Sequence, residues 1–363
     1  MQFNRRTVMR GMVGGAISLA LAPNVFAQHG PPPGKIALRF NENPYGPSAS
    51  ALKAAAEALD MGAYYPVVIP GELLNSIAAK TELGRDNLVL SSGSNEALHA
   101  AFVAWGKKGR IIQPALTYTD HLAYSLRMGV DLVTVPLAAD MSIDLDAMAA
   151  AVDDDTSLVY ICNPNNPTGM ALDGDTLRDF CRTVGKKAVV LVDEAYNELT
   201  DDPEYTSMID LVREEENVIV MRTFSKIFGM AGLRVGYGMA RPDLARTIEG
   251  HVMAWPNSPG LAAAQASYND DEFIRFSRSK VIEGRKMVNE TLRRNGVEPL
   301  PSQTNFVYAD IGRNATEFQK EMDKRGILIR GSIEPYPTFS RISMGKIEEL
   351  EVFDRVFSEV YSG

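Results

Sequence analysis

The chain has 363 residues, of which 45% are apolar and 23% charged, so it can bury a substantial core and is long enough for two domains. Its formal net charge of −9 argues against nucleic acid or an anionic membrane surface as the main partner. Two cysteines, Cys162 and Cys181, exclude a disulfide scaffold, and no Cys/His cluster has metal-ligand spacing, so no metal site is expected.

The first predicted element is an export signal at residues 1–27. It combines a basic start, an apolar stretch of twelve residues at 11–22, and small residues up to Ala27. The paired Arg5 and Arg6, followed by a glycine-containing and only mildly apolar stretch, are typical of twin-arginine signals and predict a periplasmic protein. Since about 20 apolar residues are needed to cross a membrane, no stable membrane insertion is expected.

A cytoplasmic N-terminal helix is the alternative interpretation of this segment. Three glycines within twelve residues would make such a helix a poor one. Removal of the signal would take away three arginines and no acidic residue, which would change the net charge of the exported chain to −12.

Seven short apolar runs follow, separated by helical patterns. They are four to seven residues long, rich in Val, Ile and Leu, and do not alternate strictly, which is typical of strands buried on both faces of a parallel sheet. The runs are Asn87–Ser91, Arg110–Gln113, Leu132–Val135, Ser157–Cys162, Ala188–Val192, Asn217–Thr223 and Val235–Ala240. The sequence therefore predicts an α/β fold in which a mainly parallel seven-stranded sheet is covered by helices.

The pattern changes after about Trp255 to one that is typical of a smaller α+β domain. Helices are predicted at Leu261–Asn295 with a break, Ala315–Arg325 and Ile347–Tyr361, and strands at Asn305–Asp310, Gly326–Ile329 and Arg341–Met344. We predict an N-terminal segment at 28–60 that joins the small domain, a large domain at 61–256, and a small C-terminal domain at 257–363.

Five loops at the carboxyl ends of candidate strands carry residues suited to chemistry. In open α/β sheets such loops converge at one edge. The first contains Gly93, Ser94 and Asn95 at the start of a helix, where backbone N–H groups can hold an anion, although a capped helix that binds nothing is the simpler alternative. The second, Asn163–Gly169, is a rigid turn that presents Asn166 and neighbouring amides, with a purely structural turn as the alternative.

The third loop places Asp193 directly after a buried strand and Tyr196 three residues later, although Asp193 could equally cap a helix. The fourth places Lys226 beyond a strand, between Ser225 and the later Arg234. Lysine amines form Schiff bases with carbonyls, and serine with arginine can clamp a phosphate. The fifth holds Arg341 within an apolar strand, where a charge needs a partner. An aldehyde-binding lysine, an acid and a phosphate cradle together fit one cofactor, pyridoxal 5′-phosphate.

The order of these motifs resembles that of the class I/II aminotransferases, which have the pyridoxal-phosphate-dependent transferase fold type I. The matching segments are Tyr65-Pro66, Gly93-Ser94-Asn95-Glu96, Tyr118, Asn163–Gly169, Asp193–Tyr196, Ser225-Lys226, Arg234 and Arg341. Asn41–Pro47 and Tyr64-Tyr65-Pro66 are most similar to the histidinol-phosphate aminotransferase subgroup. The resemblance implies transfer of an amino group between an amino acid and a 2-oxo acid.

The resemblance also implies catalytic roles for Lys226, Asp193 and Tyr196. Lys226 would bind the cofactor covalently and act as general acid and base. Asp193 would face the pyridine nitrogen, because a carboxylate favours the protonated ring. Asn166 and Tyr196 would hydrogen-bond the 3′ oxygen of the cofactor, and Tyr118 would stack on its ring.

The remaining implied contacts are to phosphate and substrate. The phosphate would be held by Gly93, Ser94, Asn95, Ser225, Arg234, and Tyr65 of a neighbouring subunit, so a homodimer is implied. Arg341 would bind the substrate carboxylate in a bidentate fork. Asn43, Tyr45 and Asn305 are further substrate-binding candidates, with structural roles as equal alternatives. No histidine matches a family role, and His121 is expected at the surface or capping a helix.

Substrate identity does not follow from the resemblance, because histidine biosynthesis is cytoplasmic whereas this chain carries an export signal. The leading hypothesis is a periplasmic aminotransferase that acts on an unidentified amino acid. A decarboxylase or lyase of the same fold is the first alternative, and a catalytically silent protein that binds pyridoxal phosphate is a remote one. The intact set of Lys226, Asp193 and Arg234 argues against the silent protein.

Overall fold

The computed structural model describes residues 30–363, and within them residues 36–363 form one compact unit. The export signal predicted at residues 1–27 lies outside the described residues. Since residues 36–363 are not divided further, the predicted boundary near residue 256 stays a prediction.

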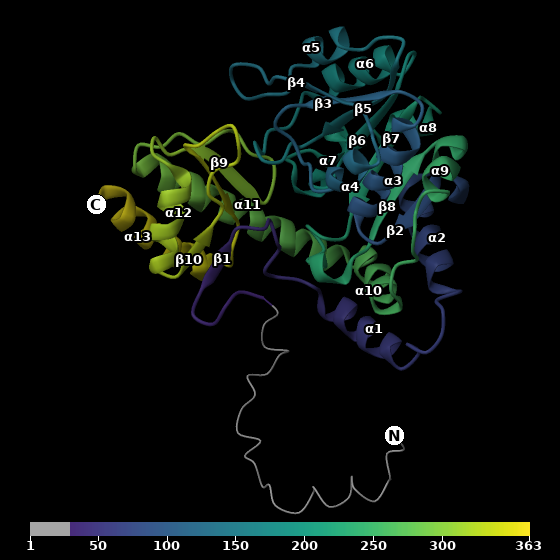
Figure 1. Cartoon of the computed structure of the whole chain (residues 1–363). Coiled ribbons are helices and arrows are strands. Elements are labelled where there is room, and N and C mark those ends of the chain that lie inside the picture. The colour runs from purple at the N-terminus through teal and green to yellow at the C-terminus, as the bar shows by residue number, and fades with distance from the viewer. Residues whose placement is uncertain (1–29) are drawn as a thin grey trace, which may run out of the picture. The chain divides into compact units, whose positions relative to one another are not determined.

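A seven-stranded sheet forms the centre of the fold, as the sequence predicts (Figure 1). Its strands, in order across the sheet, are β2 (Leu88–Ser91), β8 (Gly236–Ala240), β7 (Val218–Thr223), β6 (Val189–Asp193), β5 (Thr156–Cys162), β3 (Arg110–Pro114) and β4 (Leu132–Val135). β8 runs antiparallel to both of its neighbours, and the other pairs are parallel. The seven predicted apolar runs are these seven strands.

Both faces of the sheet are covered because its central strands are apolar on both sides. In β5, Leu158 and Tyr160 belong to one apolar cluster, and Val159 and Ile161 belong to the other. The first cluster includes residues of α3 (Ser94–Gly106), α4 (Leu122–Arg127) and α9 (Pro242–Glu249). The second includes residues of α5 (Leu145–Ala150), α6 (Gly174–Val184) and α8 (Ile209–Arg213).

The remaining strands form two small sheets. β1 (Ile36–Leu38) pairs in parallel with β10 (Ile327–Ile329), and β9 (Phe306–Asp310) pairs antiparallel with β11 (Phe339–Ser343). The first pairing joins the start of the compact unit to a strand about 290 residues later, as expected for an N-terminal segment that shares its core with the C-terminal part.

Seven further α-helices lie within residues 36–363. They are α1 (Ala49–Leu59), α2 (Ile69–Thr81), α7 (Pro203–Thr206), α10 (Ser258–Tyr268), α11 (Asp271–Arg294), α12 (Ala315–Lys324) and α13 (Ile347–Ser362). The break predicted within 261–295 lies between α10 and α11, where Asp270 caps the second helix by accepting from the N–H of Phe273. Within residues 30–363, no helix is both long and apolar enough to cross a membrane.

Candidate active site

A cavity of about 590 Å³ lies where β5, β6 and β7 end. Ten of the predicted site residues line it, although they are spread over nearly 250 positions of the sequence. They are Ser94, Asn95, Tyr118, Asn166, Asp193, Tyr196, Ser225, Lys226, Arg234 and Arg341. Parallel strands bring their carboxyl ends to one edge, which explains why loops so distant in sequence converge.

Lys226 follows β7, and its Nζ donates a hydrogen bond to the backbone carbonyl of Asn41 at 3.1 Å. Burial and then the positive charge of Arg341 lower the pKa of Lys226 to about 8. A lysine with this pKa has a substantial neutral fraction near neutral pH, and the neutral amine is the form that attacks an aldehyde.

Asp193 ends β6 and is 2% exposed. Its Oδ2 accepts a hydrogen bond from the Tyr160 hydroxyl at 3.2 Å, whereas its Oδ1 is buried with no hydrogen-bond partner in residues 30–363. Burial raises the pKa of Asp193 to about 7. An acceptor without a partner in a cavity wall suits a ligand that brings a donor.

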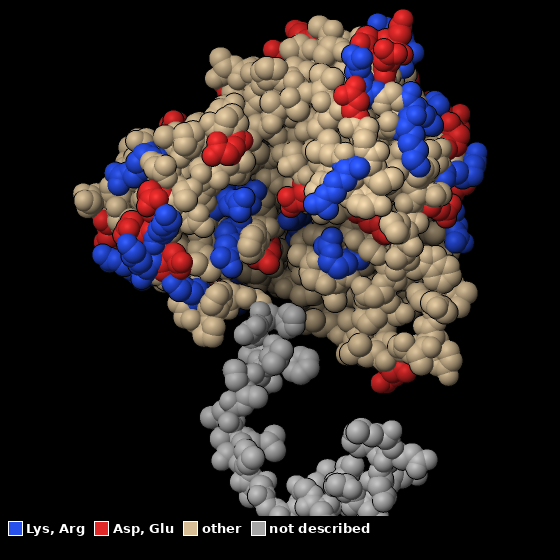
Figure 2. All heavy atoms as spheres, in the orientation of Figure 1, with Lys and Arg blue, Asp and Glu red and all other residues tan. Residues whose placement is uncertain are grey.

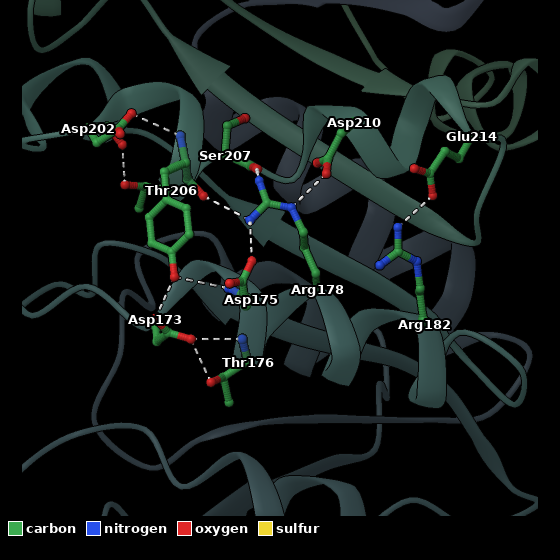
Figure 3. Close-up of polar contacts among 11 residues, drawn as sticks. Asp173, Asp175, Thr176, Arg178, Arg182, Asp202, Thr206, Ser207, Asp210 and Glu214 are labelled. Carbon is green, nitrogen blue, oxygen red and sulfur yellow. Dashed lines mark hydrogen bonds and ion pairs between the residues drawn. The ribbon is translucent and has the colours of Figure 1, made fainter.

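The turn after Asp193 is held by Glu194, whose side chain is fully buried. Glu194 accepts hydrogen bonds from the Ser207 hydroxyl at 2.8 Å and from the N–H of Met208 at 2.6 Å. Arg178 of α6 binds the 207–210 segment that Glu194 contacts, through the Asp210 carboxylate at 2.6 Å and the Ser207 carbonyl at 3.0 Å (Figure 3). These contacts anchor the segment that presents Asp193 to the cavity.

The N-terminus of α3 provides an anion site. Its N-cap, Gly93, has φ = 80°. No side chain caps α3, so the alternative of a side-chain cap, which the sequence left open, does not apply. A Cβ at Gly93 would collide with the guanidinium of Arg234. Arg234 donates to the Ser225 hydroxyl at 3.4 Å and to the carbonyl of Ala231 at 2.8 Å. A helix N-terminus, a hydroxyl and an arginine together form a cradle for a phosphate.

The hydroxyls of Tyr118 and Tyr196 are hydrogen-bonded to neighbouring side chains. The Tyr118 hydroxyl donates to Asn95 Oδ1 at 2.7 Å. The Tyr196 hydroxyl accepts from Asn41 Nδ2 at 3.1 Å and from Asn166 Nδ2 at 3.5 Å. Both tyrosine rings line the cavity, where they can contact a flat aromatic ligand.

Arg341 is a buried cation, 9% exposed, that lines the cavity. Its guanidinium donates to Asn166 Oδ1 at 2.6 Å and to the carbonyl of Arg39 at 2.9 Å, and it forms no ion pair within the described part of the chain. Burial lowers the pKa of Arg341, although it stays a cation at neutral pH. A buried guanidinium without a carboxylate partner favours an anionic ligand.

Five of the predicted residues do not line the cavity. They are Gly93, Tyr65, Asn43, Tyr45 and Asn305. Asn43 donates to the carbonyl of Ile227 at 2.8 Å, and Asn305 donates to the carbonyl of Asn41 at 2.9 Å. Tyr45 accepts from the N–H of Ile347 at 2.9 Å, and Tyr65 is exposed and packs edge-on against Trp255. Asn43, Tyr45 and Asn305 thus have structural contacts, and direct contact with substrate stays a prediction for them.

The cavity also contains residues to which the sequence assigned no role. Asn41 contacts both Lys226 and Tyr196, and it belongs to the segment Asn41–Pro47 that carried part of the resemblance. Asp120 and Arg330 also line the wall, but neither belongs to a recognisable motif. The expectation for His121 is wrong in part: it is 4% exposed and not at the surface, and although it occupies the N-cap position of α4, its side chain makes no capping hydrogen bond and its ring packs against Phe102.

The residues present fit pyridoxal phosphate. Asp193 Oδ1 can accept from the ring nitrogen, Lys226 can bind the aldehyde, and the cradle at α3 can hold the phosphate through Ser225 and Arg234. When bound, this cofactor withdraws electrons from the carbon that bears the substrate amine. The chain itself contributes a base in Lys226, a negative charge in Asp193 and a cation for the substrate in Arg341. Within residues 30–363, no cluster of His, Cys, Asp and Glu is arranged to hold a metal ion.

Comparison with known proteins shows the family of the chain. The family model for aminotransferase class I and II matches residues 33–356. Histidinol-phosphate aminotransferase of Brevibacillus brevis is 36% identical over 334 residues, which cover 90% of this chain and 91% of that protein. The enzyme of the same name from Bacillus subtilis strain 168 is 32% identical over 328 residues, with coverage of 90% and 91%.

Solved structures give the same result. Histidinol-phosphate aminotransferase from Sinorhizobium meliloti, in complex with pyridoxal-5′-phosphate, is 27% identical with a TM-score of 0.82, covering 90% of this chain and 91% of that one. The enzyme from Clostridium acetobutylicum is 25% identical with a TM-score of 0.83, covering 90% and 99%. The chain belongs to the class I and II aminotransferase family and is a pyridoxal-phosphate-dependent transaminase.

Proposed function

We propose that this transaminase works in the periplasm and transfers the amino group of an α-amino acid to a 2-oxo acid. The main support for a substrate that bears a carboxylate is the buried Arg341, whose guanidinium has only neutral hydrogen-bond partners in the described chain. A carboxylate is common to both amino acids and 2-oxo acids, so one arginine can bind the donor and the acceptor in turn.

Histidinol phosphate is the second candidate substrate. The relatives that are 32–36% identical carry its name, and Arg330 is a second arginine at the cavity that could help to bind a phosphate. The export signal favours the amino acid, because histidine biosynthesis is cytoplasmic.

A donor and acceptor screen on the mature protein tests the substrate proposal. The absorbance of the bound cofactor reports each half-reaction, and product analysis follows. Bleaching by amino acids with stoichiometric 2-oxo acid supports the proposal, whereas bleaching by histidinol phosphate alone favours the second candidate. Release of carbon dioxide would indicate a decarboxylase, and no bleaching by any donor would indicate a silent protein.

Replacement of Arg341 by lysine is expected to lower kcat/KM for amino-acid donors by about 100-fold, because lysine cannot form the two parallel hydrogen bonds that a guanidinium makes to a carboxylate. Affinity for pyridoxal phosphate should fall much less, since Ser225, Arg234 and the N-terminus of α3, which form the phosphate cradle, are unaltered. Steady-state kinetics measure the effect, with Arg246→Lys on the exposed surface of α9 as the matched control. An unchanged kcat/KM would remove Arg341 from substrate binding.

Export is tested by Arg5→Lys together with Arg6→Lys. The unaltered full chain should be recovered from the periplasmic fraction, and the double variant should accumulate in the cytoplasm, because the twin-arginine route depends on the arginine pair. Fractionation and immunoblotting measure both proteins. Unchanged export of the double variant would contradict the twin-arginine assignment, and an unaltered chain confined to the cytoplasm would contradict export itself.

A homodimer is also part of this proposal. Exposed apolar side chains lie at the end of α1, in the segment between α1 and α2, and before α10, namely Leu59, Met61, Tyr64, Tyr65, Val67, Val68, Met253 and Trp255. The surface over α1 and α10 is largely uncharged in Figure 2, whereas Lys and Arg elsewhere on that face are mixed with Asp and Glu. Such a patch is typical of a protein interface. Light scattering of the mature protein should give twice the mass of one chain, and a monomer would contradict the proposal.

A further inference from the structure

Tyr160 lies within β5, and its hydroxyl reaches the next strand of the sheet. The side chain is fully buried, with its ring in the apolar cluster beside α3, 5.5 Å from the ring of Phe102. Phenylalanine would pack equally well in this cluster, so packing does not explain the hydroxyl. The hydroxyl donates to Asp193 Oδ2 at 3.2 Å, and this is the one hydrogen bond from a side chain that Asp193 receives within residues 30–363.

His121 is another polar side chain that packs against Tyr160, and it does not replace Tyr160 as a partner of Asp193. Its ring is 5.2 Å from that of Tyr160, and both of its ring nitrogens are buried without a hydrogen-bond partner in the described chain. Burial, followed by the charge of His99, lowers the pKa of His121 to about 3. The imidazole is therefore neutral at pH 7 and supplies no positive charge to Asp193.

The two oxygens of Asp193 consequently have different surroundings. Oδ2 accepts from Tyr160, whereas Oδ1 has no partner among the described residues and belongs to a side chain in the cavity wall. We propose that Tyr160 is a positioning residue. Its hydroxyl holds Asp193 through Oδ2, so that the carboxyl group stays ionised and Oδ1 is free to accept from the ring nitrogen of the cofactor. This role is the same whichever amine is the substrate, so it does not depend on the proposed periplasmic function.

The hydrogen bond from Tyr160 affects the charge of Asp193, because few other groups near this carboxyl stabilise its ionised form. Burial raises the pKa of Asp193 to about 7, and the hydrogen bond from Tyr160 opposes burial most strongly, followed by the backbone of Ala195 and the charge of Lys226. Other titratable groups that act on Asp193 or are acted on by it are Tyr118, Cys162, Glu194 and Tyr196. None of these four stabilises the ionised carboxylate, because none is a cation and none donates a side-chain hydrogen bond to Asp193 in residues 30–363.

The test compares Tyr160→Phe with Tyr237→Phe. Tyr237, in β8, is equally buried, and its hydroxyl has no hydrogen bond to Asp193. In the cofactor-free full chain, the infrared band of the Asp193 carboxyl is identified by its loss in Asp193→Asn and is then followed with pH. Tyr160→Phe should raise the titration midpoint by about one pH unit, because it removes a donor to the charged form. A midpoint equal to that of Tyr237→Phe would overturn the proposal.

A double-mutant cycle on cofactor affinity separates positioning from packing. At pH 7, Tyr160→Phe should weaken binding of pyridoxal phosphate several-fold in the unaltered background, up to about tenfold for a one-unit shift. In the Asp193→Asn background it should have no further effect, since no carboxylate remains to be held. Equal losses in both backgrounds would show that Tyr160 acts through packing alone and would contradict the role assigned to it.

Discussion

Replacement of Lys226 by alanine is expected to lower the rate of amino-group transfer by on the order of 10⁴-fold, because one side chain supplies both the covalent anchor of the cofactor and the general base. Single-turnover absorbance with excess amino donor measures the rate. Mass spectrometry after borohydride reduction should find the cofactor attached to residue 226 in the unaltered protein and no attachment in the variant.

Lys320→Ala on the exposed surface of α12 is the matched control and should leave both measurements unchanged. Transfer by Lys226→Ala at more than a tenth of the original rate would show that another group performs the proton transfer.

The lowered pKa of Lys226 adds a pH dependence to the same experiment. The neutral amine attacks the aldehyde, and the pKa of Lys226 in the cofactor-free protein is about 8 instead of the ordinary 10.5. The rate at which the cofactor-free chain captures pyridoxal phosphate should therefore rise with pH, with a midpoint near 8, and level off above it. A rate that still rises steeply at pH 10 would show that Lys226 has an ordinary pKa.

Replacement of Asp193 by alanine is expected to lower kcat by on the order of 10²- to 10³-fold, because it removes the negative charge beside the pyridine nitrogen. Cofactor affinity should fall much less, since Ser225, Arg234 and the N-terminus of α3 remain to hold the phosphate. Steady-state kinetics and equilibrium dialysis measure the two effects separately.

Asp173→Ala provides the matched control for this substitution. Asp173 is an exposed carboxylate that caps α6 by accepting from the N–H of Thr176 (Figure 3), and it is not one of the residues that line the cavity. Its loss should lower stability slightly through the missing helix cap, without changing kcat. If Asp193→Ala lost cofactor binding as severely as turnover, the carboxylate would be an anchor for the cofactor and not a means of stabilising its protonated ring.

Much of the fold was predictable because burial on both faces leaves a local mark in the sequence. β5 and β6 are mostly apolar, and the polar residues Asn163, directly after β5, and Asp193, at the end of β6, lie at the edge to which a parallel sheet brings both strand ends. The loops that hold Lys226, Asp193 and Arg234 could be identified for the same reason. Their residue types are also chemically demanding, since few other side chains can bind an aldehyde, an aromatic nitrogen and a phosphate.

Other parts of the site could not be predicted, because their partners are set by packing between distant segments. For Asn305 and Asn43 the sequence left substrate binding and a structural role equally open, and only the structure shows that their amides bind backbone carbonyls about 260 and 180 residues away; contact with substrate stays a prediction. His121 resembled a surface or capping residue, yet its ring is buried against Phe102. Arg330 follows β10 without any motif, and only the arrangement of β10 beside β11 brings it to the cavity.

The sequence by itself indicated the strands along the chain, the cofactor class and most of the predicted residues that line the cavity, and it alone carries the pattern that predicts export. Only the tertiary structure decided which oxygen of Asp193 is occupied, which of the two neighbouring side chains, Tyr160 or His121, occupies it, and that Arg341 is buried without an ion pair in residues 30–363. The physical reason is that residue type and spacing report on burial and on chemical capacity. Hydrogen-bond partners, in contrast, depend on distances of about 3 Å across strands, and these exist only after the sheet has formed.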